Sequence, residues 1–297
     1  MPDYDYLLIG GGMAADAAAR GIRDADPDGT IGLIGTEPFA PYNRPPLSKG
    51  LWQDYSEDEI MRETDELGVD LHLGRTATTI DRRRRQVTDD SGTTYGYRKL
   101  LLATGGQPRR LSGPDTGVIY YRTLADYRRL RQLTSEPARV LVIGGGWIGA
   151  ELAAVLTDAG HSVAMAFPED GLLARLLPAG LSSSLTEQFR MRGVTVHAGR
   201  LVRSAVNGLV TFEDGAQEQY DAVVAGLGII PATGLAEASG LTVSDGIEVD
   251  EFMQTSDPDI LAAGDVASVF SPALGMRRRV EHEENANLTG WYAGQVL

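Results

Sequence analysis

YLLIGGGMAA at residues 6–15 and VLVIGGGWIG at residues 140–149 decide the fold of this chain. Each stretch is typical of a buried parallel strand that turns through glycines into a helix. The backbone N–H groups exposed at such a helix start can hold a pyrophosphate. Two such loops in one chain therefore predict two bound dinucleotides, most simply FAD and a nicotinamide nucleotide.

Both loops are parts of a longer repeat. After each loop the sequence predicts an Ala-rich helix and then a short strand, over 14–22 and 30–34 in the first copy and over 150–159 and 162–167 in the second. Each short strand is followed by an acidic residue, Glu37 or Glu169, which can accept the ribose hydroxyls of a dinucleotide. This order is far more specific than a single glycine motif.

The rest of the chain supplies more strands of the same kind. Apolar runs that end in glycine occur at 99–106, 222–228 and 260–265, and such ends let a ligand lie close over the carboxyl edge of a sheet. Alternating polarity and turn signals predict small antiparallel hairpins over 78–94 and 201–219. The predicted fold class is thus α/β, with two Rossmann-like dinucleotide-binding domains.

The order of these units predicts that the first domain is discontinuous. We expect residues 1–122 and 250–297 to form an FAD-binding domain, and residues 123–249 to form an inserted NAD(P)H-binding domain. A chain of 297 residues is long enough for two such domains, each with its own core.

The composition limits the function classes. The formal net charge of −14 disfavours nonspecific binding to nucleic acid or to anionic membranes. The chain has no cysteine, which excludes a disulfide framework, a cysteine-held metal site and a dithiol that relays electrons from a flavin. The histidines show no metal-ligand spacing, so no metal is expected. Neither a secretory leader nor a membrane-length apolar run is visible, and a cytoplasmic location is expected.

Five further segments carry a resemblance to a known family. They are PYNRPPLSK at 41–49, LATGGQPR at 102–109, FPE at 167–169, AGD at 263–265 and RRVEH at 278–282. With them the chain resembles the FAD-dependent NAD(P)H reductases of the ferredoxin-reductase kind that serve oxygenases, and most of all their apoptosis-inducing-factor branch. The resemblance implies a glutathione-reductase-like fold. Members of that family usually continue into a C-terminal domain that covers the flavin, which is expected to be absent here because the sequence stops at Leu297.

The resemblance also implies which residues bind FAD. The expected set is Gly10, Gly12, Met13, Ala14 and Ala15 at the pyrophosphate, Glu37 or Thr36 at the adenosine ribose, Ala77 at the adenine, Arg44 and Arg122 at phosphate and ribityl oxygens, and Ala103, Thr104, Gly105, Gly264 and Asp265 at the strand ends near the ribityl chain. Glu281 and His282 fall where the family presents a helix start to the flavin ring. A helix-capping or solvated histidine is the alternative for His282.

The resemblance assigns the central role at the flavin to Lys49. The resemblance places its ammonium beside flavin N5, paired with Glu151, whereas spacing by itself would favour a surface salt bridge of little energetic weight. An ammonium about 4 Å from the ring contributes about 4 kcal/mol at an effective dielectric of 20, which is on the order of 90 mV for a two-electron couple. A helix dipole contributes only about 0.3–1 kcal/mol. The effect of Lys49 on the flavin potential is therefore expected to outweigh that of the helix dipole, with Glu151 cancelling part of it.

The second loop is expected to bind the nicotinamide nucleotide through Gly144, Gly146, Ile148 and Gly149. Trp147 either gates nicotinamide stacking at the flavin face or is a core aromatic. Glu169 should bind the adenosine ribose and favour NADH over NADPH, because a carboxylate repels a 2′-phosphate. Arg175 is near enough in sequence to soften this preference, and Gly228 is expected close to the nicotinamide.

These features predict an enzyme in which NADH reduces bound FAD by direct hydride transfer, a step governed by positioning. An external acceptor, by preference a ferredoxin or Rieske-type protein, then takes the electrons. Two alternatives stay open: a redox-sensing interaction protein, and an NADH oxidase or quinone reductase. Of two basic runs, Arg82–Arg85 is interpreted as a solvated hairpin turn and Arg277–Arg279 as a docking site for an acidic carrier. The oligomeric state is left open.

Overall fold

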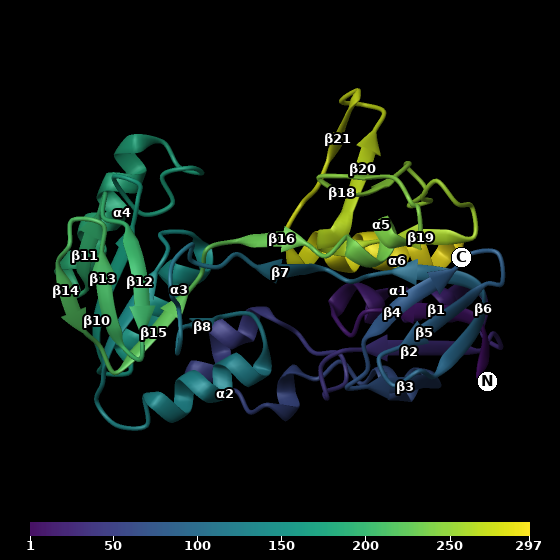
Figure 1. Ribbon diagram of the computed structural model, residues 1–297, viewed down its shortest axis with the longest axis horizontal. Coiled ribbons are helices and arrows are strands. Elements are labelled where there is room, and N and C mark those ends of the chain that lie inside the picture. Colours follow the sequence, from purple (N-terminus) through teal and green to yellow (C-terminus); the bar gives the residue numbers. More distant parts are fainter. The chain divides into compact units, whose positions relative to one another are not determined.

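The computed structural model describes residues 1–297, which divide into two compact units (Figure 1). Unit 1 comprises Met1–Asn43, Asp58–Gln107 and Pro231–Leu297, and unit 2 comprises Arg44–Glu57 and Pro108–Ile230. Both are α/β, as the sequence predicts. No helix is both long enough and apolar enough to cross a membrane.

Unit 1 is built on a seven-stranded sheet. The path through it runs β3 (Val69–Leu73), β2 (Ile31–Gly35), β1 (Asp3–Ile9), β6 (Thr94–Leu102), β5 (Gln86–Asp89) and β4 (Ala77–Asp81), and β19 (Ile260–Ala262) also pairs with β6. The strands β3, β2, β1, β6 and β19 pair in parallel, whereas β4, β5 and the start of β6 form the predicted antiparallel hairpin. The Arg82–Arg85 run is the turn of that hairpin, as predicted, but it is not wholly solvated, because the Arg82 and Arg85 guanidinium groups form ion pairs with Asp257 and Asp259.

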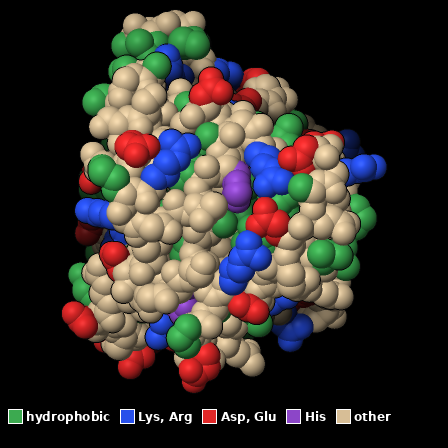
Figure 2. All heavy atoms as spheres, turned by 90° about the vertical axis from the view of Figure 1, so that its left-hand side faces the viewer, with side chains coloured by type: hydrophobic (Ala, Val, Ile, Leu, Met, Phe, Trp, Pro, Cys, Tyr) green, Lys and Arg blue, Asp and Glu red, His purple; other side chains and the backbone are tan.

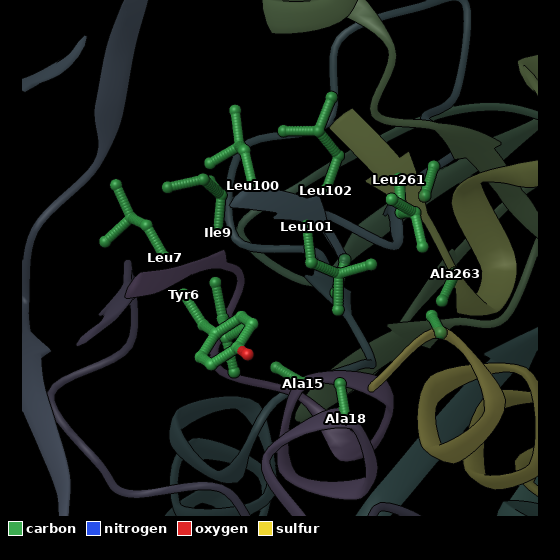
Figure 3. Close-up of a cluster of buried hydrophobic side chains, with 14 of the residues drawn as sticks. Tyr6, Leu7, Ile9, Ala15, Ala18, Leu100, Leu101, Leu102, Leu261 and Ala263 are labelled. Carbon is green, nitrogen blue, oxygen red and sulfur yellow. The ribbon is translucent and has the colours of Figure 1, made fainter. Parts of the chain in front are cut away.

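The strands β2 and β19 and the carboxyl-terminal ends of β1 and β6 are buried on both faces, which explains their continuous apolar sequences. The outermost parallel strand, β3, is only partly buried and contains the polar residues Asp70 and His72. Leu7, Leu101 and Leu261 are fully or almost fully buried, and Figure 3 shows their side chains in one cluster with Ala15 and Ala18 of the covering helix.

Two helices of unit 1 pack with their backbones in close contact. They are α1 (Met13–Ala25) and α6 (Glu283–Val296). A Cβ on Gly290 would lie 2.3 Å from the Ala14 carbonyl oxygen, and one on Gly294 would lie 2.2 Å from that of Ala18. Glycine is thus required at both positions because any side chain would push α6 away from α1.

The remaining elements of unit 1 are short. They are η3 (Asp58–Ile60), η4 (Thr64–Leu67), α5 (Gly234–Ala238), η5 (Gly264–Val266), and a four-stranded sheet in the order β17 (Val243–Ser244), β18 (Gly246–Val249), β20 (Ala267–Ser271) and β21 (Met276–Arg278).

Unit 2 holds a parallel five-stranded sheet in the order β11 (Thr195–Ala198), β10 (Ser162–Phe167), β9 (Arg139–Ile143), β15 (Ala222–Ala225) and β8 (Ile119–Tyr120). Its helices are η1 (Pro45–Ser48), η2 (Gly50–Trp52), α2 (Leu124–Leu133), α3 (Trp147–Asp158) and α4 (Ala179–Met191). The predicted hairpin region over 201–219 is confirmed as the antiparallel sheet β12 (Val202–Val206), β13 (Leu209–Phe212) and β14 (Gln217–Gln219). The pair β7 (Gly106–Pro108) and β16 (Ile229–Pro231) marks where the chain passes from one unit to the other.

The limits of the two units differ from the expected domain limits at three places. Residues 231–249 lie in unit 1, because β18 pairs with β20. Residues 108–122 lie in unit 2, because β8 pairs with β15. Residues 44–57 also lie in unit 2, where buried aromatic side chains hold them. Elements of two to five residues give too little periodicity to assign them from sequence.

Candidate functional site

The first glycine loop joins β1 to α1 and has the geometry of a ligand cradle. Gly10 has φ +125°, and a Cβ there would lie 2.2 Å from the Ala103 carbonyl oxygen, so no other residue fits. Gly12 is the N-cap of α1, and no side chain caps its first turn. The Ala15 and Asp16 N–H groups donate to the Gly12 carbonyl, so the N–H groups of Met13 and Ala14 at the start of α1 are left for an outside acceptor.

The second glycine loop repeats this geometry in unit 2. Gly144 has φ +117°, and a Cβ there would lie 2.4 Å from the Gly226 carbonyl oxygen. Gly146 is the uncapped N-cap of α3, with no atom within 4 Å of where its Cβ would be. A Cβ on Gly149 would lie 2.0 Å from the Gly144 carbonyl oxygen, so this glycine lets α3 pack directly on the loop. Both loops thus fit a dinucleotide pyrophosphate.

The carboxyl ends of three strands meet beside the first loop, as expected. Ile9 of β1 and Ala262 of β19 both lie in register with Leu102 of β6. The residues that follow these strand ends include Gly10, Ala103 and Gly264. A Cβ on Gly264, whose φ is +74°, would lie 2.8 Å from the Ala14 side chain. The structure therefore brings these predicted FAD residues together at one sheet edge.

The other strand-end residues have backbone partners in unit 1. The Thr104 hydroxyl donates to the Ala232 carbonyl at 2.9 Å, and the Gly105 carbonyl accepts from the Ala232 N–H at 2.9 Å. Asp265 lies in η5 directly after Gly264, and Ala77 begins β4.

The position expected at the adenosine ribose holds a carboxylate of fixed orientation. Oε2 of Glu37 accepts a hydrogen bond of 2.6 Å from the Tyr42 hydroxyl, and Tyr42 is buried. The neighbouring Thr36 hydroxyl instead accepts from the Thr76 hydroxyl at 3.3 Å. Sequence reasoning missed Tyr42, whose only signal is its place in the PYNRPPLSK segment.

The start of α6 shows His282 in a capping role. Its Nδ1 accepts a hydrogen bond of 3.1 Å from the Glu284 N–H, as the capping alternative describes. The Glu281 carboxylate accepts from Nη1 of Arg279 at 2.6 Å. Arg279 also binds Asp245, at 3.0 Å.

The basic run at 277–279 is largely engaged inside unit 1. Arg279 also donates to the Asp265 carbonyl at 3.3 Å, and the Arg277 guanidinium binds the Val249 and Ser268 carbonyls at 2.7 and 2.9 Å. Of the three arginines, only Arg278 is exposed and has no ion-pair or hydrogen-bond partner for its guanidinium group. The run therefore offers an acidic carrier less charge than its sequence suggests.

Three residues expected at FAD, namely Arg44, Lys49 and Arg122, belong to unit 2. Nη1 of Arg44 donates to the Arg122 carbonyl at 2.8 Å, so these two are neighbours.

The turn that carries Lys49 is fixed by buried aromatic residues. The Leu47 carbonyl accepts from Nε1 of Trp52 at 2.8 Å and from the Tyr121 hydroxyl. The Tyr127 hydroxyl donates to the Leu51 carbonyl at 2.8 Å. The backbone on both sides of Lys49 is thus anchored.

Lys49 and Glu151 lie together in unit 2. Nζ of Lys49 is 3.1 Å from Oε1 of Glu151. Oε2 of Glu151 accepts a hydrogen bond of 2.6 Å from the hydroxyl of Ser48, a residue that sequence reasoning missed. Trp147, four residues before Glu151, is 58% exposed and is therefore no core aromatic. Its neighbour Ile148 is also exposed.

At the end of β10 an ion pair occupies the expected ribose position. Oε1 of Glu169 lies 2.6 Å from Nη2 of Arg175, whose side chain is 80% exposed. The loop between them is held to the second glycine loop, because the Leu173 N–H donates to the Gly145 carbonyl at 2.8 Å. Gly228, with φ +79°, accepts a hydrogen bond from the Arg109 N–H at 2.9 Å. On the face drawn in Figure 2, Lys and Arg side chains are interspersed with Asp and Glu.

Comparison of the sequence with known proteins shows the family to which this chain is related. The family model described as pyridine nucleotide-disulphide oxidoreductase matches residues 4–290. "Apoptosis-inducing factor 1, mitochondrial" of Dictyostelium discoideum is 36% identical over 99% of this chain and 62% of its own length. The anthranilate 1,2-dioxygenase system ferredoxin–NAD(+) reductase component of Burkholderia cepacia is 38% identical over 93% of this chain and 71% of its own length. The chain thus spans about two thirds of the length of these relatives.

The chain is also similar to a solved structure over its whole length. The crystal structure of the covalent putidaredoxin reductase–putidaredoxin complex has a TM-score of 0.93 and 32% identity. The match covers 100% of this chain and 75% of that chain.

Proposed function

This chain belongs to the pyridine nucleotide-disulphide oxidoreductase family, and from that premise we propose that it oxidises NADH, holds FAD and passes electrons to a ferredoxin-type protein. Relatives of the ferredoxin-reductase kind use FAD and NAD(P)H. Bound FAD would supply the redox chemistry, since it accepts a hydride from a nicotinamide and can release the electrons singly.

The observation that carries this proposal is the pair of glycine loops. Each combines an uncapped helix start with a glycine at which a Cβ would meet backbone, Gly10 in unit 1 and Gly144 in unit 2. We assign the first loop to the FAD pyrophosphate, with Glu37 at the ribose. We assign the second loop to NADH, with Glu169 at the ribose.

The absence of cysteine narrows the chemistry within this family. Its name refers to disulphides, yet the 297 residues contain no cysteine. Electrons therefore cannot pass through a dithiol of this chain, and an external acceptor must take them from the flavin. A ferredoxin-type acceptor is supported by relatives such as the Burkholderia reductase component and by the putidaredoxin complex.

The chain's own residues have positioning roles in this reaction. We assign Lys49 and Glu151 to the charge beside the flavin, and Arg44 and Arg122 to its phosphate and ribityl oxygens. The exposed Trp147 ring at the start of α3 is suited to gate access of the nicotinamide. The step needs no acid or base, because hydride moves directly between the two rings.

A second candidate function rests on the Dictyostelium relative. In it the chain is a redox-sensing interaction protein, in which reduction by NADH changes the conformation or the oligomeric state and turnover is incidental.

The test is anaerobic stopped-flow mixing of the FAD-loaded protein with NADH, followed by mixing with a ferredoxin. The proposal expects the flavin absorbance to bleach and then to return rapidly when ferredoxin is added. Purified protein that takes up no FAD, or FAD that NADH never bleaches, contradicts the proposal. A long-lived reduced complex that ferredoxin does not reoxidise favours the second candidate.

A further inference from the structure

The carboxylate of Glu151 has one partner on each oxygen. Oε1 lies 3.1 Å from Nζ of Lys49, and Oε2 accepts the 2.6 Å hydrogen bond from Oγ of Ser48. The side chains of Lys49 and Glu151 are 54% and 24% exposed, whereas Ser48 is 2% exposed. The buried partner is therefore the serine, not the lysine.

The hydroxyl of Ser48 has one proton, and the geometry shows where it goes. The Glu151 oxygen is 2.6 Å away, whereas the Pro45 carbonyl oxygen is 3.5 Å away, at the limit for a hydrogen bond. An ionised acceptor also strengthens a hydrogen bond. Ser48 thus donates to Glu151.

The two partners differ in how firmly they can hold the carboxylate. An ion pair with a half-exposed ammonium on a flexible side chain contributes little, because water screens the charges and the side chain loses entropy. Ser48 has a short side chain at the end of η1, on backbone that Trp52 and Tyr121 anchor at Leu47. The serine hydroxyl is therefore the fixed point of this group.

We propose that Ser48 is a positioning residue that holds the Glu151 carboxylate against Lys49 and so sets how much of the ammonium charge is neutralised. This inference rests on the proposed function, in which Lys49 acts on the flavin. Without the hydroxyl the carboxylate can turn towards water, and the Lys49 charge is then less compensated. An uncompensated cation favours the more negative, reduced form of a bound flavin.

The test measures the midpoint potential of the FAD-loaded protein by reductive titration with dithionite against a reference dye. It needs neither NADH nor turnover. The variants are Ser48→Ala, Glu151→Gln and the double variant, and the control is Ser182→Ala, which removes an equally buried serine hydroxyl of unit 2 bound to the Leu172 carbonyl.

We expect the effects of Ser48→Ala and Glu151→Gln on the midpoint potential to be non-additive. Ser48→Ala raises the ratio of reduced to oxidised flavin at a fixed potential about threefold, which is about 14 mV for a two-electron couple. Glu151→Gln shifts the ratio in the same direction, and Ser48→Ala adds nothing in the Glu151→Gln background. Ser182→Ala leaves the potential unchanged. If Ser48→Ala does not retain FAD, Ser48→Cys replaces it, because a thiol is a much weaker donor.

Two outcomes overturn the inference. One is an unchanged potential in Ser48→Ala while Glu151→Gln shifts it, and the other is an equal effect of Ser48→Ala with and without the Glu151 carboxylate. Failure of the proposed function looks different. In that case Lys49→Ala also leaves the potential unchanged, or NADH never reduces the flavin of the unaltered protein.

Discussion

The buried Tyr42 hydroxyl and the Glu37 carboxylate form a hydrogen bond of 2.6 Å, and it fixes the acid that follows β2. Glu37 is the residue that we assign to the adenosine ribose of FAD. A carboxylate that is already oriented loses less conformational freedom when it accepts the ribose hydroxyls. Tyr42 is thus expected to contribute to FAD affinity without touching FAD.

The first prediction concerns this pair. Tyr42→Phe should raise the FAD dissociation constant about tenfold, or about 1.4 kcal/mol, because Glu37 loses its orienting partner. The measurement is fluorescence titration of the FAD-free protein with FAD. The matched control is Thr36→Val at the alternative ribose position, which should change the constant less than twofold. A larger effect of Thr36→Val than of Tyr42→Phe would assign the ribose to Thr36.

The second prediction concerns the ion pair between Glu169 and Arg175. The carboxylate repels a 2′-phosphate, whereas the exposed guanidinium 2.6 Å away can bind one. Wild-type protein should prefer NADH, and Glu169→Gln should shift the kcat/KM ratio towards NADPH by about tenfold. Arg175→Gln should lower kcat/KM for NADPH about threefold or more and leave that for NADH within twofold. An equal loss with both nucleotides would remove Arg175 from the phosphate site.

The third prediction separates ligand space from packing space in the second glycine loop. Gly146→Ala adds a Cβ that meets no protein atom within 4 Å, so the free energy of unfolding should change by less than about 1 kcal/mol. The same Cβ stands where we place the pyrophosphate, and the dissociation constant of NADH should rise about tenfold or more. Gly149→Ala should instead destabilise the protein by about 1–3 kcal/mol, because its Cβ meets the Gly144 carbonyl. Urea unfolding and NADH titration of both variants check this. Normal NADH affinity in Gly146→Ala would contradict the placement.

The strands and loops could be predicted from sequence because a parallel strand buried on both faces is a continuous apolar run. The limits of β10 (Ser162–Phe167) and β15 (Ala222–Ala225) agree with the predicted ones, and α1 and α3 begin at the predicted glycine loops. The strand expected from residue 99 is the second half of β6, because its first half, from Thr94, pairs with β5 in a hairpin.

The hydrogen-bond partners of the site could not be predicted in this way. Ser48 and Glu151 are 103 residues apart, and no local pattern relates a hydroxyl to a carboxylate over that separation. Likewise, no sequence pattern relates Tyr42 to Glu37, and the fold brings its hydroxyl to that carboxylate. Sequence motifs therefore identified candidate residues such as Lys49 and Glu37, whereas the residues that orient them are visible only in the three-dimensional structure.

The last prediction concerns Asp89, at the end of β5. Oδ1 accepts hydrogen bonds from the N–H groups of Ser91 and Thr93, at 2.9 Å each, and from the Ser91 hydroxyl at 2.7 Å. Oδ2 accepts one from the Tyr95 hydroxyl at 2.9 Å. Burial by itself would raise the pKa of Asp89, but these hydrogen bonds outweigh it and lower the pKa from 3.8 to about 2. The ionised carboxylate thus stabilises the hairpin between β5 and β6.

Because the folded pKa of Asp89 lies below its unfolded value, this stabilisation is present above about pH 4 and is lost as the pH falls towards 2. Asp89→Asn should therefore lower the free energy of unfolding by about 1–3 kcal/mol at pH 7, and the difference from the unaltered protein should shrink between pH 4 and pH 2. Urea unfolding at a series of pH values measures this. Asp28→Asn, at an exposed aspartate of unit 1, is the control and should change the free energy by less than about 0.5 kcal/mol. Protonation of Asp89 near pH 2 should remove the stability that its charge contributes. If the difference in the free energy of unfolding between Asp89→Asn and the unaltered protein instead stays constant down to pH 2, the loss comes from packing and not from the charge.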